Sequence, residues 1–192
     1  ARVATDAIAA AVDEMPHLRP RHRLVHLQVA SEAVYREIAR LGIVADIQPR
    51  FLATDWPIVE ARFGPDRAKW SYIWRTLAAL GIPTAGGSDS PIEPLDPLLG
   101  MHAALTRQDP DGNPGGGFYP DERLSGDGAL SLFSSGVAYA AGAENVRGRI
   151  HPGYKADFTV VEGDYLADPA RTAECNTVLL TIVDGAVVYE KK

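Results

Sequence analysis

The stretch Gly86–Pro91, with the sequence GGSDSP, directly follows the short apolar run Leu80–Ala85, with the sequence LGIPTA. A short apolar run bounded by turn residues is typical of a buried strand, so Asp89 comes just after the carboxyl end of that strand. Parallel α/β sheets place their catalytic groups at this end, and small neighbours leave room for a ligand or metal ion. A turn or N-cap aspartate is the competing interpretation, because Ser-Asp-Ser-Pro is also a good turn sequence.

A histidine occupies a similar position farther upstream. The apolar pattern predicts a strand over Leu24–Val29, with His26 near its carboxyl end. His26 is either a core histidine bonded to the backbone or a residue whose ring points into a site. Imidazole nitrogen and carboxylate oxygen are both suitable zinc ligands, so His26 and Asp89 together indicate a metal-hydrolase site. The remaining ligands of such a site are missing from this chain.

Composition excludes several classes of protein. The chain has 192 residues, of which 46% are hydrophobic and 23% charged, and its net charge is −6. This is enough apolar material for a sizeable core, and the absence of a basic run argues against nucleic-acid and membrane partners. Cys175 is the single cysteine, so no intrachain disulfide can form. No apolar stretch has the length of a membrane span and no signal peptide opens the chain, which predicts a cytoplasmic location.

The order of predicted elements indicates an α/β fold. Helices are predicted over 3–15, 31–41, 57–63, 66–80, 97–107 and 125–141, and strands over 24–29, 43–48, within 80–85, 157–161, 178–183 and 186–190. Ser31 and Ser125 are expected N-caps, and Gly42 an expected C-terminal glycine. Residues 108–123 lack periodicity and are predicted to form a mobile surface loop that buries no core. Asp184-Gly185 predicts a hairpin. A parallel βα segment is thus expected over 1–145, followed by a β-rich tail over 146–192.

Two further residues are weaker candidates for substrate binding. Trp56 is most simply a core residue, but in a loop it would line a substrate pocket. His102 falls on a predicted helix, where it is either structural or lines the site. The chain also starts without methionine and inside the helical pattern 3–15, which indicates a fragment.

Several of these segments match one family. Residues 21–28 (RHRLVHLQ) resemble the HR-x-x-H-x-Q stretch of the amidohydrolase superfamily, specifically the amidohydrolase-3 branch that includes N-substituted formamide deformylases. Further matching segments follow in order at 47–49, 64–67, 75–77, 81–83, 87–91, 96–98, 148–150, 153–157 and 181–185. The likeness covers nearly the whole chain, and the order and spacing of the motifs make it specific.

The resemblance implies a fold and a metal site. The family fold is a TIM-like (β/α)₈ barrel flanked by a small β-sandwich, of which this chain would supply about the last three strands (1–145) and a tail for the sandwich (146–192). The family site combines a His-x-His pair, a Lys or Glu, two further histidines and an aspartate. His26 matches the histidine after the sixth strand and Asp89 the aspartate after the eighth, while the other ligands have no counterpart.

The resemblance also implies a reaction. A divalent metal, with zinc expected, would lower the pKa of a water molecule, and Asp89 would take its proton and pass it to the leaving amine. The substrate would be a small molecule with an amide or formamide C–N bond, and the chain alone is expected to be inactive. One alternative is a non-catalytic α/β module that assembles with itself or with a complementary N-terminal segment. Another is an independent doubly wound binding domain in which His26 and Asp89 are incidental.

Overall fold

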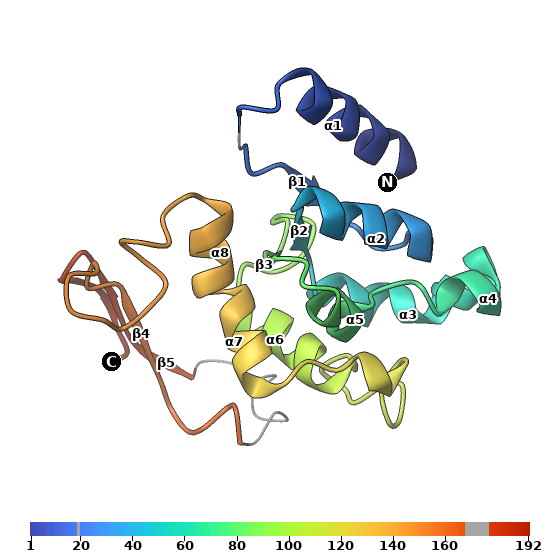
Figure 1. Cartoon of the computed structure of the whole chain (residues 1–192). Helices are drawn as coiled ribbons and strands as arrows, with labels where there is room; N and C mark the ends of the chain where they lie inside the picture. The colour runs from blue at the N-terminus through green and yellow to red at the C-terminus, as the bar shows by residue number, and fades with distance from the viewer. Residues whose placement is uncertain (19, 168–176) are drawn as a thin grey trace.

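Three short parallel strands lie at the centre of the molecule (Figure 1): β1 (Arg23–Val25), β2 (Val44–Ile47) and β3 (Thr84–Gly86). The computed structural model describes residues 1–18, 20–167 and 177–192, so Cys175 lies outside the described residues. The strands neighbour one another in chain order, β1-β2-β3, with Arg23 paired to Val44 and Ile47 to Gly86. A doubly wound sheet reverses its strand order at a switch point, and these three strands have no such reversal.

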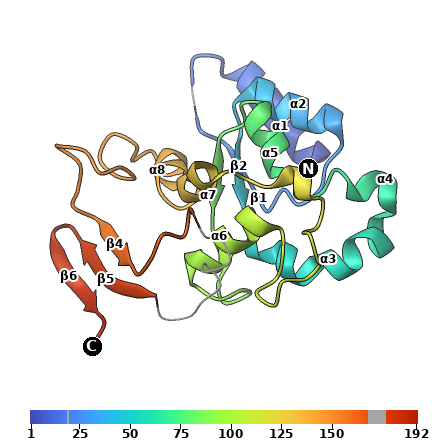
Figure 2. The ribbon, with the colours of Figure 1, turned by 90° about the horizontal axis from the view of Figure 1, so that it is seen from below.

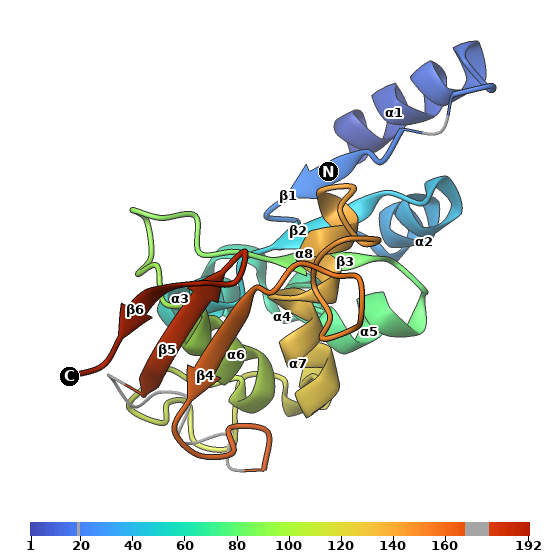
Figure 3. The same cartoon turned by 90° about the vertical axis from the view of Figure 1, so that its left-hand side faces the viewer.

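Helices connect and cover the strands. α2 (Glu32–Leu41) joins β1 to β2, while α3 (Arg50–Phe63), α4 (Pro65–Ala68) and α5 (Trp74–Ala79) lead from β2 to β3. After β3 come α6 (Pro97–Thr106), the 3₁₀ turn η1 (Pro120–Glu122), α7 (Gly126–Leu132) and α8 (Ser135–Ala140), and both α7 and α8 contact β3. α1 (Arg2–Glu14) contacts α2 and otherwise projects from the body (Figure 3). None of the described helices has the length and apolarity needed to cross a membrane.

The expected caps are mostly present. Gly42 ends α2 in the left-handed conformation with φ 63°, and the hydroxyl of Ser125 accepts a hydrogen bond from the Gly128 amide at 3.2 Å. Ser31 occupies the N-cap of α2, but its side chain makes no capping bond. The core between sheet and helices includes the fully buried side chains of Tyr35, Ile38, Ile43, Leu52 and Leu77.

A second sheet is formed by the end of the chain. β4 (Phe158–Val161), β5 (Val178–Val183) and β6 (Ala186–Glu190) are antiparallel, in the order β4-β5-β6. Figure 2 shows this sheet beside α7 and α8, away from α1. The predicted hairpin is confirmed, because β5 and β6 pair on either side of Asp184-Gly185. The boundary between 145 and 146 stays a prediction.

Several predicted boundaries are wrong, each for an identifiable reason. β1 ends at Val25 rather than Val29, because His26 and Leu27 take left-handed backbone angles. α3 begins at Arg50, and Pro57 lies inside it rather than at its start. The predicted helix 66–80 is interrupted before α5 because Tyr72 has φ 53°.

The predicted helix 125–141 is also divided, into α7 and α8. The division accompanies the packing of Phe133 between β3 and α6. A Cβ on Gly100 would lie 2.5 Å from the Phe133 ring, and one on Gly86 would lie 3.1 Å from it. Glycine at both positions is therefore what lets the ring pack there.

Residues 108–123 do bury core, contrary to the sequence expectation. Phe118 is 8% exposed, and its carbonyl accepts a hydrogen bond from Nε of Arg107 at 2.8 Å. Arg107 itself is 0% exposed; its Nη1 donates to the Tyr72 carbonyl at 2.6 Å, and its guanidinium lies over the Trp74 ring. Burial lowers the pKa of Arg107 to about 9, so it remains a cation at neutral pH. Arg107 therefore connects residues 108–123, through Phe118, to Tyr72 in the segment that precedes α5.

Candidate functional site

The carboxyl ends of the three parallel strands bring three polar residues to one edge of the sheet. His26 directly follows β1, Gln48 directly follows β2, and Asp89 lies three positions after β3. Because β2 is the middle strand, Gln48 comes from the strand between those that carry the two predicted metal ligands. His26 and Asp89 thus both follow strands of the same parallel sheet at its carboxyl edge, and their role as metal ligands stays a prediction.

Both candidates also have an uncommon backbone. Seven non-glycine residues of the described part of the chain have positive φ, among them His26 (70°), its neighbour Leu27 (41°) and Asp89 (56°). Such conformations cost on the order of 1–3 kcal/mol each and concentrate at functional sites. At His26 the conformation is held by the backbone amide, which donates to the Asp46 carbonyl at 2.8 Å. His26 and Asp89, the two residues that the sequence singled out, are thus among the seven.

The His26 ring is held by residues of the next strand and helix. Its Nδ1 lies 2.9 Å from Oε1 of Gln48, and its ring stacks on Phe51, with centroids 5.7 Å apart and an interplanar angle of 20°. Gln48 is buried and was not identified from the sequence. The signal was present, because Gln48 also follows an apolar run and precedes a proline.

An ion pair joins β1 to β2 just before this edge. Nη1 of Arg23 lies 3.4 Å from Oδ2 of Asp46. Arg23 is on β1 and Asp46 on β2, and these two strands pair with Val25 opposite Asp46. Burial raises the pKa of Asp46, while Arg23 and His26 act in the opposite direction. Asp46 was likewise not identified from the sequence.

A partly buried polar network contacts the segment that follows His26. The Gln28 amide donates to Oδ2 of Asp55 at 2.9 Å and contacts the Tyr72 hydroxyl at 2.8 Å, and that hydroxyl donates to Asp55. Burial raises the pKa of Tyr72, as do its hydrogen bond to Asp55 and the carboxylate charge. The network anchors Gln28 to α3 and to the turn before α5.

The two weaker candidates lie elsewhere. Trp56 is on α3 rather than in a loop, half-buried against the core. His102 is 5% exposed on α6, and its Nε2 lies 3.1 Å from the Asp109 carbonyl. Neither residue lines the two cavities described next, and their proposed contact with substrate stays a prediction.

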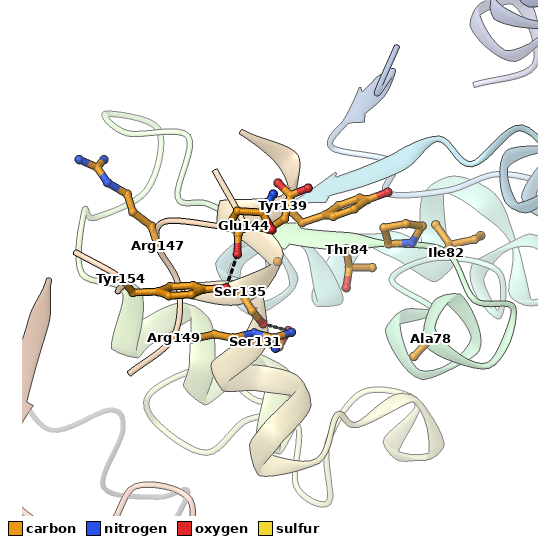
Figure 4. A pocket seen from close by; sticks show the side chains of 13 residues that line it. Ala78, Ile82, Thr84, Ser131, Ser135, Tyr139, Glu144, Arg147, Arg149 and Tyr154 are labelled. Carbon is orange, nitrogen blue, oxygen red and sulfur yellow. Dashed lines mark hydrogen bonds between the residues drawn. The ribbon is translucent and has the colours of Figure 1, made fainter. Parts of the chain in front are cut away.

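Among the cavities on the described surface, two lie near β3. The larger, about 450 Å³, lies at the opposite, amino end of β3, between α5, α7, α8 and residues 144–154 (Figure 4). The hydroxyls of Ser131 and Ser135 are 2.9 Å apart there, and the Tyr154 hydroxyl donates to the Glu144 carbonyl at 2.8 Å. The smaller, about 200 Å³, is lined by Gly87 and Ser88 and so borders the edge that carries Asp89.

A salt bridge beside the larger cavity connects distant parts of the chain. Arg21, just before β1, forms a two-pronged ion pair with Glu144, which follows α8, and donates to the Tyr139 carbonyl at 2.6 Å. The Arg21 guanidinium also lies 4.1 Å from the centre of the Tyr139 ring. Hydrogen bonding to Arg21 lowers the pKa of Glu144 to about 2.

His26 and Asp89 place one nitrogen-bearing and one oxygen-bearing side chain after strands of the same sheet. Histidine and aspartate are the ligand types that zinc accepts. Within residues 1–18, 20–167 and 177–192, however, no group of three or more His, Cys, Asp or Glu side chains is arranged to hold a metal ion.

The sequence of this chain is similar to a known family and to two of its members. The family model described as "Amidohydrolase family" matches residues 1–189. The "Putative amidohydrolase YtcJ" of Bacillus subtilis is 40% identical over 98% of this chain and 36% of its own length. The N-substituted formamide deformylase of Arthrobacter pascens is 28% identical over 88% of this chain and 31% of its own length. This chain thus spans about a third of the length of these relatives.

Solved structures agree with the sequence relatives. A metal-dependent hydrolase from Pyrococcus horikoshii OT3 matches with a TM-score of 0.71 and 26% identity, over 86% of this chain and 34% of that one. A metal-dependent hydrolase from Pyrococcus furiosus matches with a TM-score of 0.64 and 29% identity, over 79% of this chain and 30% of that one. The βα arrangement described above therefore resembles a segment of the fold of these two metal-dependent hydrolases.

Proposed function

Because this chain belongs to the amidohydrolase family, we propose that it forms part of a metal-dependent hydrolase that cleaves the C–N bond of a small amide or formamide. In this proposal β1, β2 and β3 are the last three strands of a (β/α)₈ barrel, and residues 146–192 belong to a small β-sandwich. The observation that carries the proposal is the position of His26 and Asp89 at the same sheet edge, both with left-handed backbone. The formamide deformylase relative supports the choice of bond.

His26 and Asp89 are the residues that would hold the metal. A bound divalent ion, with zinc expected, would supply a water molecule of lowered pKa. The remaining ligands would come from a part of the barrel that this chain does not contain.

The Asp89 carboxylate would also transfer a proton during the reaction. Its oxygen can accept a proton from the attacking water and return it to the departing amine nitrogen. His26 serves as a ligand only, because its Nδ1 is already bonded to Gln48. The net reaction adds water across the C–N bond and releases an acid and an amine.

Metal content tests this division of ligands. Two side chains make a weak, open site, so the 192-residue chain is expected to lose zinc on dialysis against a chelator and to hydrolyse no N-substituted formamide. Elemental analysis after dialysis is the measurement, with the His26→Asn chain as the control for adventitious zinc. One zinc ion per chain retained through dialysis by the unmodified chain alone would contradict the proposal.

A second candidate function has an observation in its favour. Every residue of β6 is exposed, including Val187 at 58% and Val188 at 61%, and Val25 on β1 is 52% exposed. Edge strands with unpaired backbone groups and apolar side chains are usually covered in soluble proteins. We therefore infer, as the second candidate, a module that pairs with a second copy or with a complementary N-terminal segment.

Association state tests this second candidate. The isolated chain is expected to form dimers or larger species through the β1 and β6 edges, measured by size-exclusion chromatography with light scattering. A Val188→Lys variant places a charge on β6 and should shift the distribution toward monomer. A stable monomer at all concentrations would remove this candidate.

A further inference from the structure

The proton on the His26 ring has a defined position in this structure. We propose that Gln48 is a positioning residue that keeps this proton on Nδ1 and leaves Nε2 as the nitrogen that binds the metal. Only the part about metal binding at Nε2 rests on the proposed function. The location of the proton on Nδ1 follows from the contacts of the metal-free chain.

The orientation of the Gln48 amide comes from its two neighbours. Its Nε2 faces the Asp46 carbonyl oxygen at 3.4 Å, and its Oε1 faces Nδ1 of His26 at 2.9 Å. A carbonyl oxygen can only accept, so the amide nitrogen belongs on the Asp46 side. The amide oxygen then meets the imidazole and can only accept from it. Nδ1 must therefore carry the hydrogen.

The surroundings leave this arrangement little freedom. Gln48 is 6% exposed, so water has little access to the amide. The Asp46 carbonyl accepts the His26 backbone amide at 2.8 Å as well as facing the Gln48 side chain. Stacking on Phe51 limits rotation of the His26 ring. The same strand end thus fixes the backbone and the ring of His26.

The consequence for metal binding concerns the other ring nitrogen. A neutral imidazole has one N–H and one free lone pair, and the partner of one nitrogen determines which tautomer is present. No residue that the structure describes bonds to Nε2 of His26. Metal-binding histidines commonly donate their other N–H to an oxygen, which fixes both tautomer and orientation. Gln48 supplies such an oxygen from the neighbouring strand.

The test is the tautomer of His26, read directly by NMR. The 192-residue chain is labelled with ¹⁵N-histidine, and long-range ¹H–¹⁵N spectra are recorded without metal at pH 9. The His26 signals are those absent from a His26→Asn chain.

The unmodified chain and Gln48→Glu, which keeps an acceptor oxygen, are expected to show the Nδ1–H form. Gln48→Met is expected to lose that preference, and the distant Gln108→Met to retain it. Added zinc should shift Nε2.

Several results would overturn the proposal. These are an Nε2–H tautomer in the unmodified chain, an unchanged tautomer in Gln48→Met with native-like amide dispersion, or a zinc shift at Nδ1. If Gln48→Met does not fold, the unmodified and Gln48→Glu spectra still decide the outcome. The expected tautomers together with a complete enzyme that hydrolyses no C–N bond would instead refute the proposed function and leave the proton assignment intact.

Discussion

Replacement of Asp89 by asparagine is expected to lower kcat by at least about 10²–10⁴-fold in the hydrolytically competent protein, with the fold retained. The amide is nearly isosteric with the carboxylate but cannot accept the proton of the attacking water, and general acid–base catalysis typically contributes a factor of this size. Release of amine from an N-substituted formamide measures the effect, and circular dichroism checks the fold.

The matched control is Asp66→Asn. The Asp66 side chain is 98% exposed and its ion pair with Lys69 is on the surface, so the same chemical change there should leave kcat unaltered. Metal analysis of both variants shows whether Asp89 acts as a ligand as well as a base. An Asp89→Asn enzyme with full activity would remove Asp89 from the mechanism.

Replacement of Arg107 by methionine is expected to lower the free energy of unfolding by about 2–4 kcal/mol. Methionine preserves much of the aliphatic volume but leaves the Phe118 carbonyl without its buried donor, at about 1–3 kcal/mol. It also removes one of the two donors to the Tyr72 carbonyl, which keeps its hydrogen bond from the Trp74 amide at 3.0 Å. Relief from burying the charge offsets part of this loss. Urea denaturation followed by tryptophan fluorescence is the measurement, since Trp74 lies against the guanidinium.

Arg75→Met is the control for this substitution. Arg75 is exposed and makes one long hydrogen bond, 3.2 Å, to the Asp121 carbonyl. Its loss should change the free energy of unfolding by less than about 1 kcal/mol. Equal urea midpoints for the two variants would show that the Arg107 contacts contribute nothing to stability beyond those of a surface arginine.

The positions of His26 and Asp89 could be predicted because each depends on a single short stretch of sequence. His26 and Asp89 each follow an apolar run, and parallel strands bring such positions to one edge. The same rule applies to Gln48, which was overlooked because an amide is not a usual metal ligand or base. Its importance comes from its distance to His26, and only the register of β1 against β2 determines that distance.

The missed features of the fold depend on contacts between distant residues. Helix propensity favours a continuous helix through 66–80, yet Tyr72 is left-handed because its amide donates to the Gln28 carbonyl and its carbonyl accepts from Arg107. Ser71 also pairs with Val29 in an isolated bridge. Tertiary contacts of this kind override local propensity, and no pattern within residues 66–80 reports them.

The pairing of Arg21 with Glu144 has a consequence for folding kinetics. These residues are 123 positions apart in sequence, and they connect the segment before β1 to the segment after α8, which packs on β3 at the other side of the sheet. Closing so long a loop costs more entropy than local contacts do, so we expect the pair to form after the rate-limiting step. Interactions that form this late slow unfolding and leave the folding rate almost unchanged. The pair therefore prolongs the lifetime of the native state without helping the chain to reach it.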